Sequence, residues 1–143
     1  MKYLVDTDWA IDHLHSVERV VRRLEELAHE GLGLSVIALA ELYEGVFHSS
    51  DPEGNERGLQ NFLTGISVVS VDEETCRMFG RERARLRTEG RLIADFDLMI
   101  AVSCLRHGLT LLSNSRRHFE QVEGLAIISA ESGQPSRMDM PTP

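Results

Sequence analysis

Short apolar segments alternate with helical segments along this chain, and this alternation restricts the fold more than any other feature. Strand-like apolar segments occupy residues 2–5, 32–35, 66–71, 109–112 and 126–128. Strands that are separated by helices pair in parallel and are covered by helices on both faces. The sequence therefore predicts an α/β fold, a three-layer α/β/α sandwich with a central, mostly parallel sheet.

Helical periodicity and end signals locate the segments between these strands. Helices are predicted at residues 8–15, 16–29, 36–47, 57–64, 73–88 and 95–107. Ser16 and Asp72 are residue types that cap helix N-termini, and Gly108 stands where a glycine commonly ends a helix. The polar segment 48–56 contains a proline and a glycine and is predicted to be a loop.

At 143 residues, the chain has the length of one domain, which we place at residues 1–130. Residues 131–143 offer little to bury and are expected to be a disordered tail. No apolar run reaches the roughly 18 residues that span a bilayer, so we expect no membrane segment and a cytoplasmic protein. Cys76 and Cys104 lie in apolar helical patterns and are expected to be buried free thiols.

The net charge of −8 argues against a simple electrostatic nucleic-acid binder, whose surface would be basic. Carboxylates that bind a metal also count as negative until the metal is present, which weakens this objection. The basic residues are 14 arginines and the single lysine Lys2. Arginine suits bidentate phosphate contacts, although genome composition also explains such a bias.

Three carboxylates interrupt segments that otherwise look like protein core. Asp6 ends the first strand, Glu41 lies within an apolar helix, and Asp97 lies in the first turn of another apolar helix. Burying an unpaired carboxylate is costly, so three of them in such segments suggest convergence on a cation. Oxygen ligands of this kind suit Mg²⁺ or Mn²⁺.

Each carboxylate also has a simpler explanation. Asp6 is a residue type that caps helices, although Asp8 is better placed for that role. Glu41 can lie at the seam between a helix surface and solvent. Asp97 and its neighbour Asp95 can complement the dipole of their helix, with Asp95 as the N-cap.

The order and spacing of these motifs resemble the PIN-domain family, and most closely its VapC-type toxins of prokaryotic toxin–antitoxin pairs. The matching segments are residues 3–7, 35–45, 93–101, 107–115, 117–119 and 122–125. The resemblance implies a metal-dependent endoribonuclease whose catalytic and metal-binding acids are Asp6, Glu41 and Asp97, with Mg²⁺ or Mn²⁺ as cofactor. It also implies an RNA substrate, a cognate antitoxin as partner, and a homodimer.

The chain departs from the family's fullest pattern after the fourth strand. Many members carry an acid there, whereas this chain has Ser113, Asn114 and Ser115, and His118 stands where some members carry a further acid. The number of metal ions, one or two, is therefore open. Residues that can support the site are Thr7, Asp95, Asn114 and Ser115.

Two arginines beside the expected site, Arg116 and Arg117, are the first candidates for RNA backbone contacts. The series Arg81, Arg83, Arg85, Arg87 and Arg91 can extend this patch. A solvated helix face with glutamate partners explains most of that series equally simply.

Two alternative functions follow from the same residues. The segment Asp6-Thr7-Asp8 resembles the nucleophile loop of haloacid-dehalogenase-like phosphatases, but those enzymes need a lysine in the pocket, and Lys2 lies at the wrong end of the first strand. A PIN scaffold that has lost catalysis and binds RNA or a protein partner is the other alternative, and the missing fourth acid motivates it.

Overall fold

The computed structural model of the chain describes residues 1–130. Its strands are β1 (Tyr3–Val5), β2 (Leu32–Ser35), β3 (Ile66–Val69), β4 (Thr110–Leu112) and β5 (Ile127–Ile128). Its helices are α1 (Thr7–Leu14), α2 (Glu18–Leu27), the 3₁₀ turn η1 (Ala28–Glu30), α3 (Val36–His48), α4 (Pro52–Leu63), α5 (Glu73–Thr88), α6 (Asp95–His107) and α7 (Arg116–Phe119).

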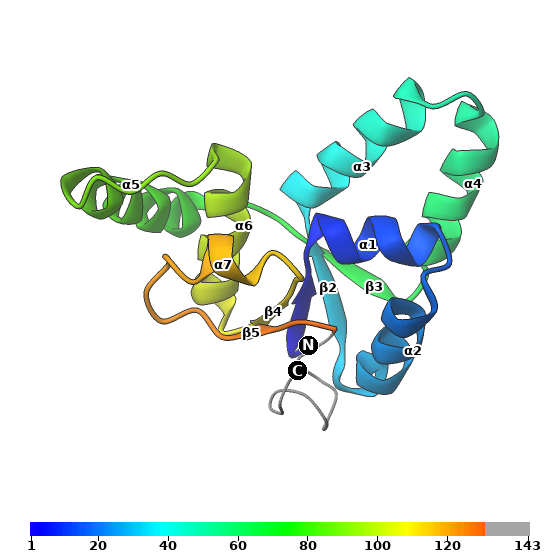
Figure 1. The fold of residues 1–143 in the computed structure, drawn as a ribbon, viewed down its shortest axis with the longest axis horizontal. Helices are drawn as coiled ribbons and strands as arrows, with labels where there is room; N and C mark the ends of the chain where they lie inside the picture. Colours follow the sequence, from blue (N-terminus) through cyan, green and yellow to red (C-terminus); the bar gives the residue numbers. More distant parts are fainter. Residues whose placement is uncertain (131–143) are drawn as a thin grey trace.

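The strands form one parallel sheet in the order β3-β2-β1-β4-β5, with β1 at its centre. Leu4, Val5, Leu34 and Leu111 are fully buried, as expected for a sheet that is covered on both faces. Helices α1 to α4 lie on one side of the sheet and α5 to α7 on the other (Figure 1). The predicted α/β sandwich with a parallel sheet is confirmed.

The predicted N-cap Ser16 is wrong. Ser16 has a left-handed backbone (φ 61°), and its amide donates a hydrogen bond to the carbonyl of His13 at the end of α1. Helix α2 therefore begins only at Glu18, with Val17 at the N-cap position. Ser16 belongs to the turn between two helices rather than to the second helix.

The predicted loop at residues 48–56 is shorter than expected, because α4 begins at Pro52. The Asp51 carboxylate accepts a hydrogen bond from the amide of Gly54 (3.1 Å) and caps this helix. Proline suits the first helical position, since its missing N–H would be unpaired there in any case. Pro52 is therefore the start of a helix rather than part of a loop.

Other element boundaries differ by smaller amounts. Strand β3 ends at Val69 rather than at residue 71, and the N-cap of α6 is Ala94 rather than Asp95. Asp72 caps α5 as predicted, through hydrogen bonds from the amide and hydroxyl of Thr75. Of the two free cysteines, Cys104 is buried but Cys76 is exposed, so the prediction of burial is wrong for Cys76.

Two predictions about the ends and the environment of the chain have different outcomes. The predicted disorder of residues 131–143 lies outside the described residues. Within residues 1–130, no helix is long and apolar enough to cross a membrane.

Candidate active site

The side chains singled out from the sequence gather where the parallel strands end. Asp6 follows β1, and Ser113 to Ser115 follow its neighbour β4. Helices α1 and α3 both begin at this edge, and their N-terminal ends lie side by side opposite α6 and α7 (Figure 1). Binding sites of parallel α/β sheets typically form at this edge.

Asp6 is almost completely buried, with 4% of its surface exposed. It occupies the N-cap position of α1, but its side chain caps no amide of that helix. One oxygen instead accepts a hydrogen bond from the hydroxyl of Ser113 (2.8 Å). Burial, reinforced by the charges of Asp8 and Asp97, raises the pKa of Asp6 to about 7. Within residues 1–130, this carboxylate has no positively charged partner.

Glu41 lies on α3 and contacts the first residue of α1. One of its oxygens accepts a hydrogen bond from the hydroxyl of Thr7 (2.6 Å), the residue that follows Asp6. Glu41 also borders an apolar pocket of about 310 Å³ between α1, α3 and α4, together with Leu42 and Val46. The Thr7 hydrogen bond thus holds the Glu41 carboxylate close to the end of β1, the central strand.

Asp97 lies in the first turn of α6 and is partly exposed. One of its oxygens is 3.1 Å from Nε2 of His118, on α7, and its charge is felt by Asp6. Asp95, in contrast, is 80% exposed and forms an ion pair with Arg83 of α5. The structure therefore brings Asp97 to the site and directs Asp95 away from it.

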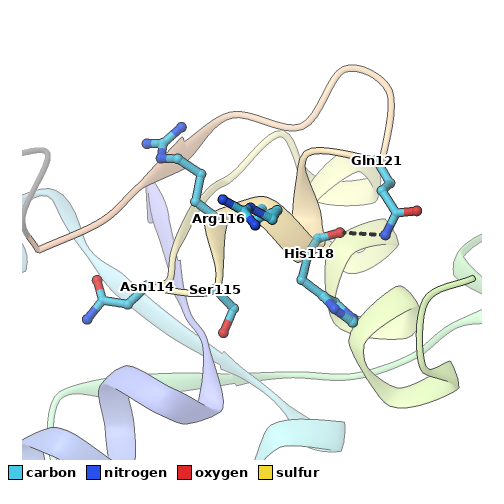
Figure 2. A pocket seen from close by; sticks show the side chains of 6 residues that line it. Asn114, Ser115, Arg116, His118 and Gln121 are labelled. Atoms are coloured by element: carbon cyan, nitrogen blue, oxygen red, sulfur yellow. Dashed lines mark hydrogen bonds between the residues drawn. The ribbon is translucent and has the colours of Figure 1, made fainter.

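The loop after β4 forms an open pocket of about 600 Å³ with the start of α7. Ser115 and His118 project from the same side of this loop, while Asn114 is turned away (Figure 2). The Asn114 side chain accepts hydrogen bonds from Nε1 of Trp9 and from the amide of Ala130. It therefore anchors the loop rather than facing the acids.

The two candidate arginines differ in their surroundings. Arg116 donates a hydrogen bond to the carbonyl of Ile127 on β5 (2.7 Å) and lies near Glu120. Arg117 is exposed and borders the same pocket, with no ion-pair partner among the residues that the structure describes. In the arginine series of α5, Arg85 is paired with Glu82 and Glu89, as the simpler explanation predicts.

Sequence reasoning does not reveal the partners of Asp8, which it treats as a helix cap. Its carboxylate turns back from α1 and accepts hydrogen bonds from the Asn114 amide (3.0 Å) and the Ser115 hydroxyl (3.2 Å). Burial raises the pKa of Asp8 as well. The spacing of two in Asp6-Thr7-Asp8 hinted at paired carboxylates, but only the fold shows which loop Asp8 meets.

The residues present fit a hard divalent cation by the chemistry of their donors. The buried Asp6 lies beside the partly buried Asp8, and one oxygen of Asp8 has no hydrogen-bond partner among the described residues. Within residues 1–130, however, no three Asp, Glu, His or Cys side chains lie close enough to form a finished metal shell. Side chains must therefore move closer together for a metal to bind.

Comparisons with known proteins identify the family of this chain. The model of the PIN domain matches residues 3–125. A tRNA(fMet)-specific endonuclease VapC of Shigella flexneri is 32% identical over 125 residues, covering 87% of this chain and 95% of that protein. Ribonuclease VapC2 of Haemophilus influenzae is 34% identical over 130 residues, again covering 87% and 95%.

Solved structures give the same result. VapBC2 of Rickettsia felis, bound to a DNA fragment from its promoter, contains a chain that superposes with a TM-score of 0.85 at 27% identity, over 90% of this chain and 98% of that one. DNA-bound VapBC of Salmonella typhimurium gives the same score and identity, over 91% and 98%. This chain therefore belongs to the PIN-domain family, and its relatives within the family are VapC proteins.

Proposed function

We propose that this chain is an endoribonuclease that acts as the toxin of a toxin–antitoxin pair and depends on Mg²⁺ or Mn²⁺. The observation that carries the proposal is the buried Asp6. It has no basic partner among the described residues, and the carboxylates of Asp8 and Asp97 lie close enough to raise its pKa. Family membership and relatives that are named ribonucleases support the activity.

The residues of the site differ in their roles in this proposal. Asp6, Glu41 and Asp97 would hold the metal, which would supply a bound water of lowered pKa and positive charge to offset that of the scissile phosphate. Thr7 fixes the Glu41 carboxylate through its 2.6 Å hydrogen bond. His118 orients Asp97 from across the pocket. Asp95 has no direct role, because it faces Arg83 and solvent.

RNA reaches the acids through the open pocket on the side of α7. Arg117 is the better candidate for a phosphate contact, because its guanidinium is exposed and unpaired within the described part of the chain. Arg116 holds β5 and contributes mainly to the shape of the pocket. Transfer RNA is the first substrate to test, since the Shigella relative is named as specific for one.

A cognate antitoxin is the proposed protein partner, as the VapBC complexes suggest. The apolar pocket beside Glu41 suits a segment with an apolar side chain next to a cationic one, which would pair with the acids. We further propose a homodimer that acts in the cytoplasm, where its RNA substrate is found.

End-mapping of cellular RNA after brief induction tests the activity directly. We expect new, discrete RNA ends in cells that express the wild-type chain and none in cells that express Asp97→Asn. If both proteins produce the same ends, the assigned site is wrong.

A non-catalytic scaffold is the second candidate, because the loop after β4 supplies no carboxylate. This alternative predicts that the purified chain binds RNA or an antitoxin without producing new ends under any metal condition. The same end-mapping experiment therefore separates the two candidates.

A further inference from the structure

The loop after β4 lacks an acid, but it donates hydrogen bonds to a carboxylate from another element. Oδ2 of Asp8, on α1, accepts hydrogen bonds from the amide of Asn114 (3.0 Å) and the hydroxyl of Ser115 (3.2 Å), and it lies 3.5 Å from the Ser113 hydroxyl. Asn114 and Ser115 thus hold one oxygen of a residue more than 100 positions earlier in the chain.

The other oxygen of Asp8 has no such partners. Oδ1 is buried and forms no hydrogen bond among the described residues. A carboxylate oxygen has two acceptor sites, and a buried acceptor without a donor is unfavourable. The loop thus fixes Asp8 by one oxygen and leaves the other available for a ligand.

Asp6 and Asp8 also lack a group that balances their charges. The single proton of the Ser113 hydroxyl points to Asp6 at 2.8 Å, so it cannot serve both carboxylates. Among residues 1–130, neither aspartate forms an ion pair with a lysine, arginine or histidine. A buried carboxylate beside a partly buried one is stabilised when a cation joins them.

We propose that Asp8 supplies the fourth carboxylate of the metal site, through Oδ1, in place of an acid on the loop after β4. This inference rests on the proposed function, because it assumes that Asp6 binds the metal. On this proposal, the loop after β4 holds the metal-binding residue Asp8, which lies on α1. The proposal also explains why one buried oxygen of Asp8 has no hydrogen-bond partner among the described residues.

Calorimetric titration of the purified, metal-free chain with Mn²⁺ tests the proposal without an activity assay. Groups that only orient a ligand cost about 10- to 100-fold in metal affinity when they are removed. We therefore expect Asp8→Asn to weaken Mn²⁺ binding by at least about tenfold. Asp12→Asn, which removes the same charge one helical turn further along α1, should bind as the wild type does.

The asparagine variant separates a ligand from a residue that merely anchors the loop. Its amide oxygen still accepts the Asn114 and Ser115 hydrogen bonds, whereas Asp8→Ala removes them. A purely anchoring role predicts wild-type Mn²⁺ affinity in Asp8→Asn and a loss only in Asp8→Ala, and that result would overturn the proposal. If Asp8→Asn does not fold, Asp8→Gln is titrated instead, because its amide oxygen can also accept the loop hydrogen bonds, and the same loss of Mn²⁺ affinity is expected.

Asp6→Asn shows which of the two proposals fails if binding does not change as expected. Loss of Mn²⁺ binding in Asp6→Asn, with wild-type affinity in Asp8→Asn, overturns the role of Asp8 alone. Wild-type affinity in both variants overturns the metal site itself, and with it the proposed function. Weak binding in both supports both.

Discussion

At the scale of single residues, the fold tolerates an arrangement that is unfavourable without a ligand. Asp6 is nearly inaccessible to water, and its neighbour Asp8 carries the same charge. Proteins rarely keep such pairs except at functional sites, where the groups act on a substrate or a cation. The unfavourable arrangement is itself measurable in the metal-free protein.

Asp6 makes the metal-free protein less stable as the pH rises. Its folded-state pKa of about 7 lies above the ordinary value of 3.8, so the folded state retains the proton through this interval. The stability that protonated Asp6 contributes is fully present below about pH 4. It is lost as the pH rises to about 7, and the loss is on the order of 2–4 kcal/mol. Urea unfolding in EDTA at several pH values measures this loss.

The Asp6→Asn variant isolates this effect from the other titrating groups. Its stability relative to the wild type is expected to rise across the same pH interval, because asparagine carries no charge. A constant difference between the two proteins from pH 4 to pH 8 would show that Asp6 is not perturbed.

Asn114 is expected to contribute to stability rather than to chemistry. Its side-chain oxygen accepts hydrogen bonds from Trp9 (3.0 Å) and from the amide of Ala130 (2.8 Å). Asn114→Ala leaves two donors unpaired and should destabilise the fold by about 2–3 kcal/mol. Urea unfolding followed by the fluorescence of Trp9, the only tryptophan, measures the change. The exposed Asn61→Ala is the control and should change stability little.

At the scale of elements, the strands and helix cores were predictable because their signals are local. Apolar runs fix the strands, and helical periodicity fixes α5 and α6 within one or two residues. The start of α4 was missed because Pro52 is compatible with both a loop and a first helical turn. Ser16 was assigned incorrectly because the hydrogen bond that holds its backbone comes from the preceding helix.

The site was predictable only in part, for a related reason. Asp6, Glu41 and Asp97 stand out because each is a charge in an apolar segment. The partnership of Asp8 with the loop after β4 joins residues 105 to 107 positions apart, and no local pattern reveals it. The same holds for His118 and Asp97, which meet only because α7 packs on α6.

Two glycines, one at the end of α6 and one inside α5, are expected to respond to alanine substitution in opposite ways. Gly108 has φ 66°, which an L side chain rarely adopts, so Gly108→Ala should destabilise the protein by about 1 kcal/mol. Gly80 lies inside α5, where an added Cβ meets nothing within 4 Å, so Gly80→Ala should stabilise by about 0.5–1 kcal/mol. Thermal unfolding measures both changes in stability. Equal effects of the two substitutions would contradict the left-handed conformation of Gly108 at the end of α6.

At the scale of the whole molecule, several large apolar side chains are exposed on the surface. Phe47, Leu92 and Phe96 are 64%, 82% and 53% exposed, respectively. We expect a homodimer, so light scattering at micromolar concentration should give twice the chain mass of 16.1 kDa. A single species at the chain mass would contradict this expectation.

The net charge of −8 has a consequence for RNA binding. A chain with this charge repels a polyanion, so a metal that neutralises the acids should make close approach of RNA possible. Metal dependence is thus expected for substrate engagement as well as for cleavage.

Cleavage of a labelled RNA by the purified chain in Mn²⁺ tests the central claim most directly. The wild type and Asp12→Asn are predicted to cut it, EDTA to stop the reaction, and Asp6→Asn and Asp97→Asn to lose at least about a hundredfold in rate. Equal cleavage by the wild type and Asp6→Asn, or undiminished cleavage in EDTA, would contradict a metal-dependent nuclease built on these acids.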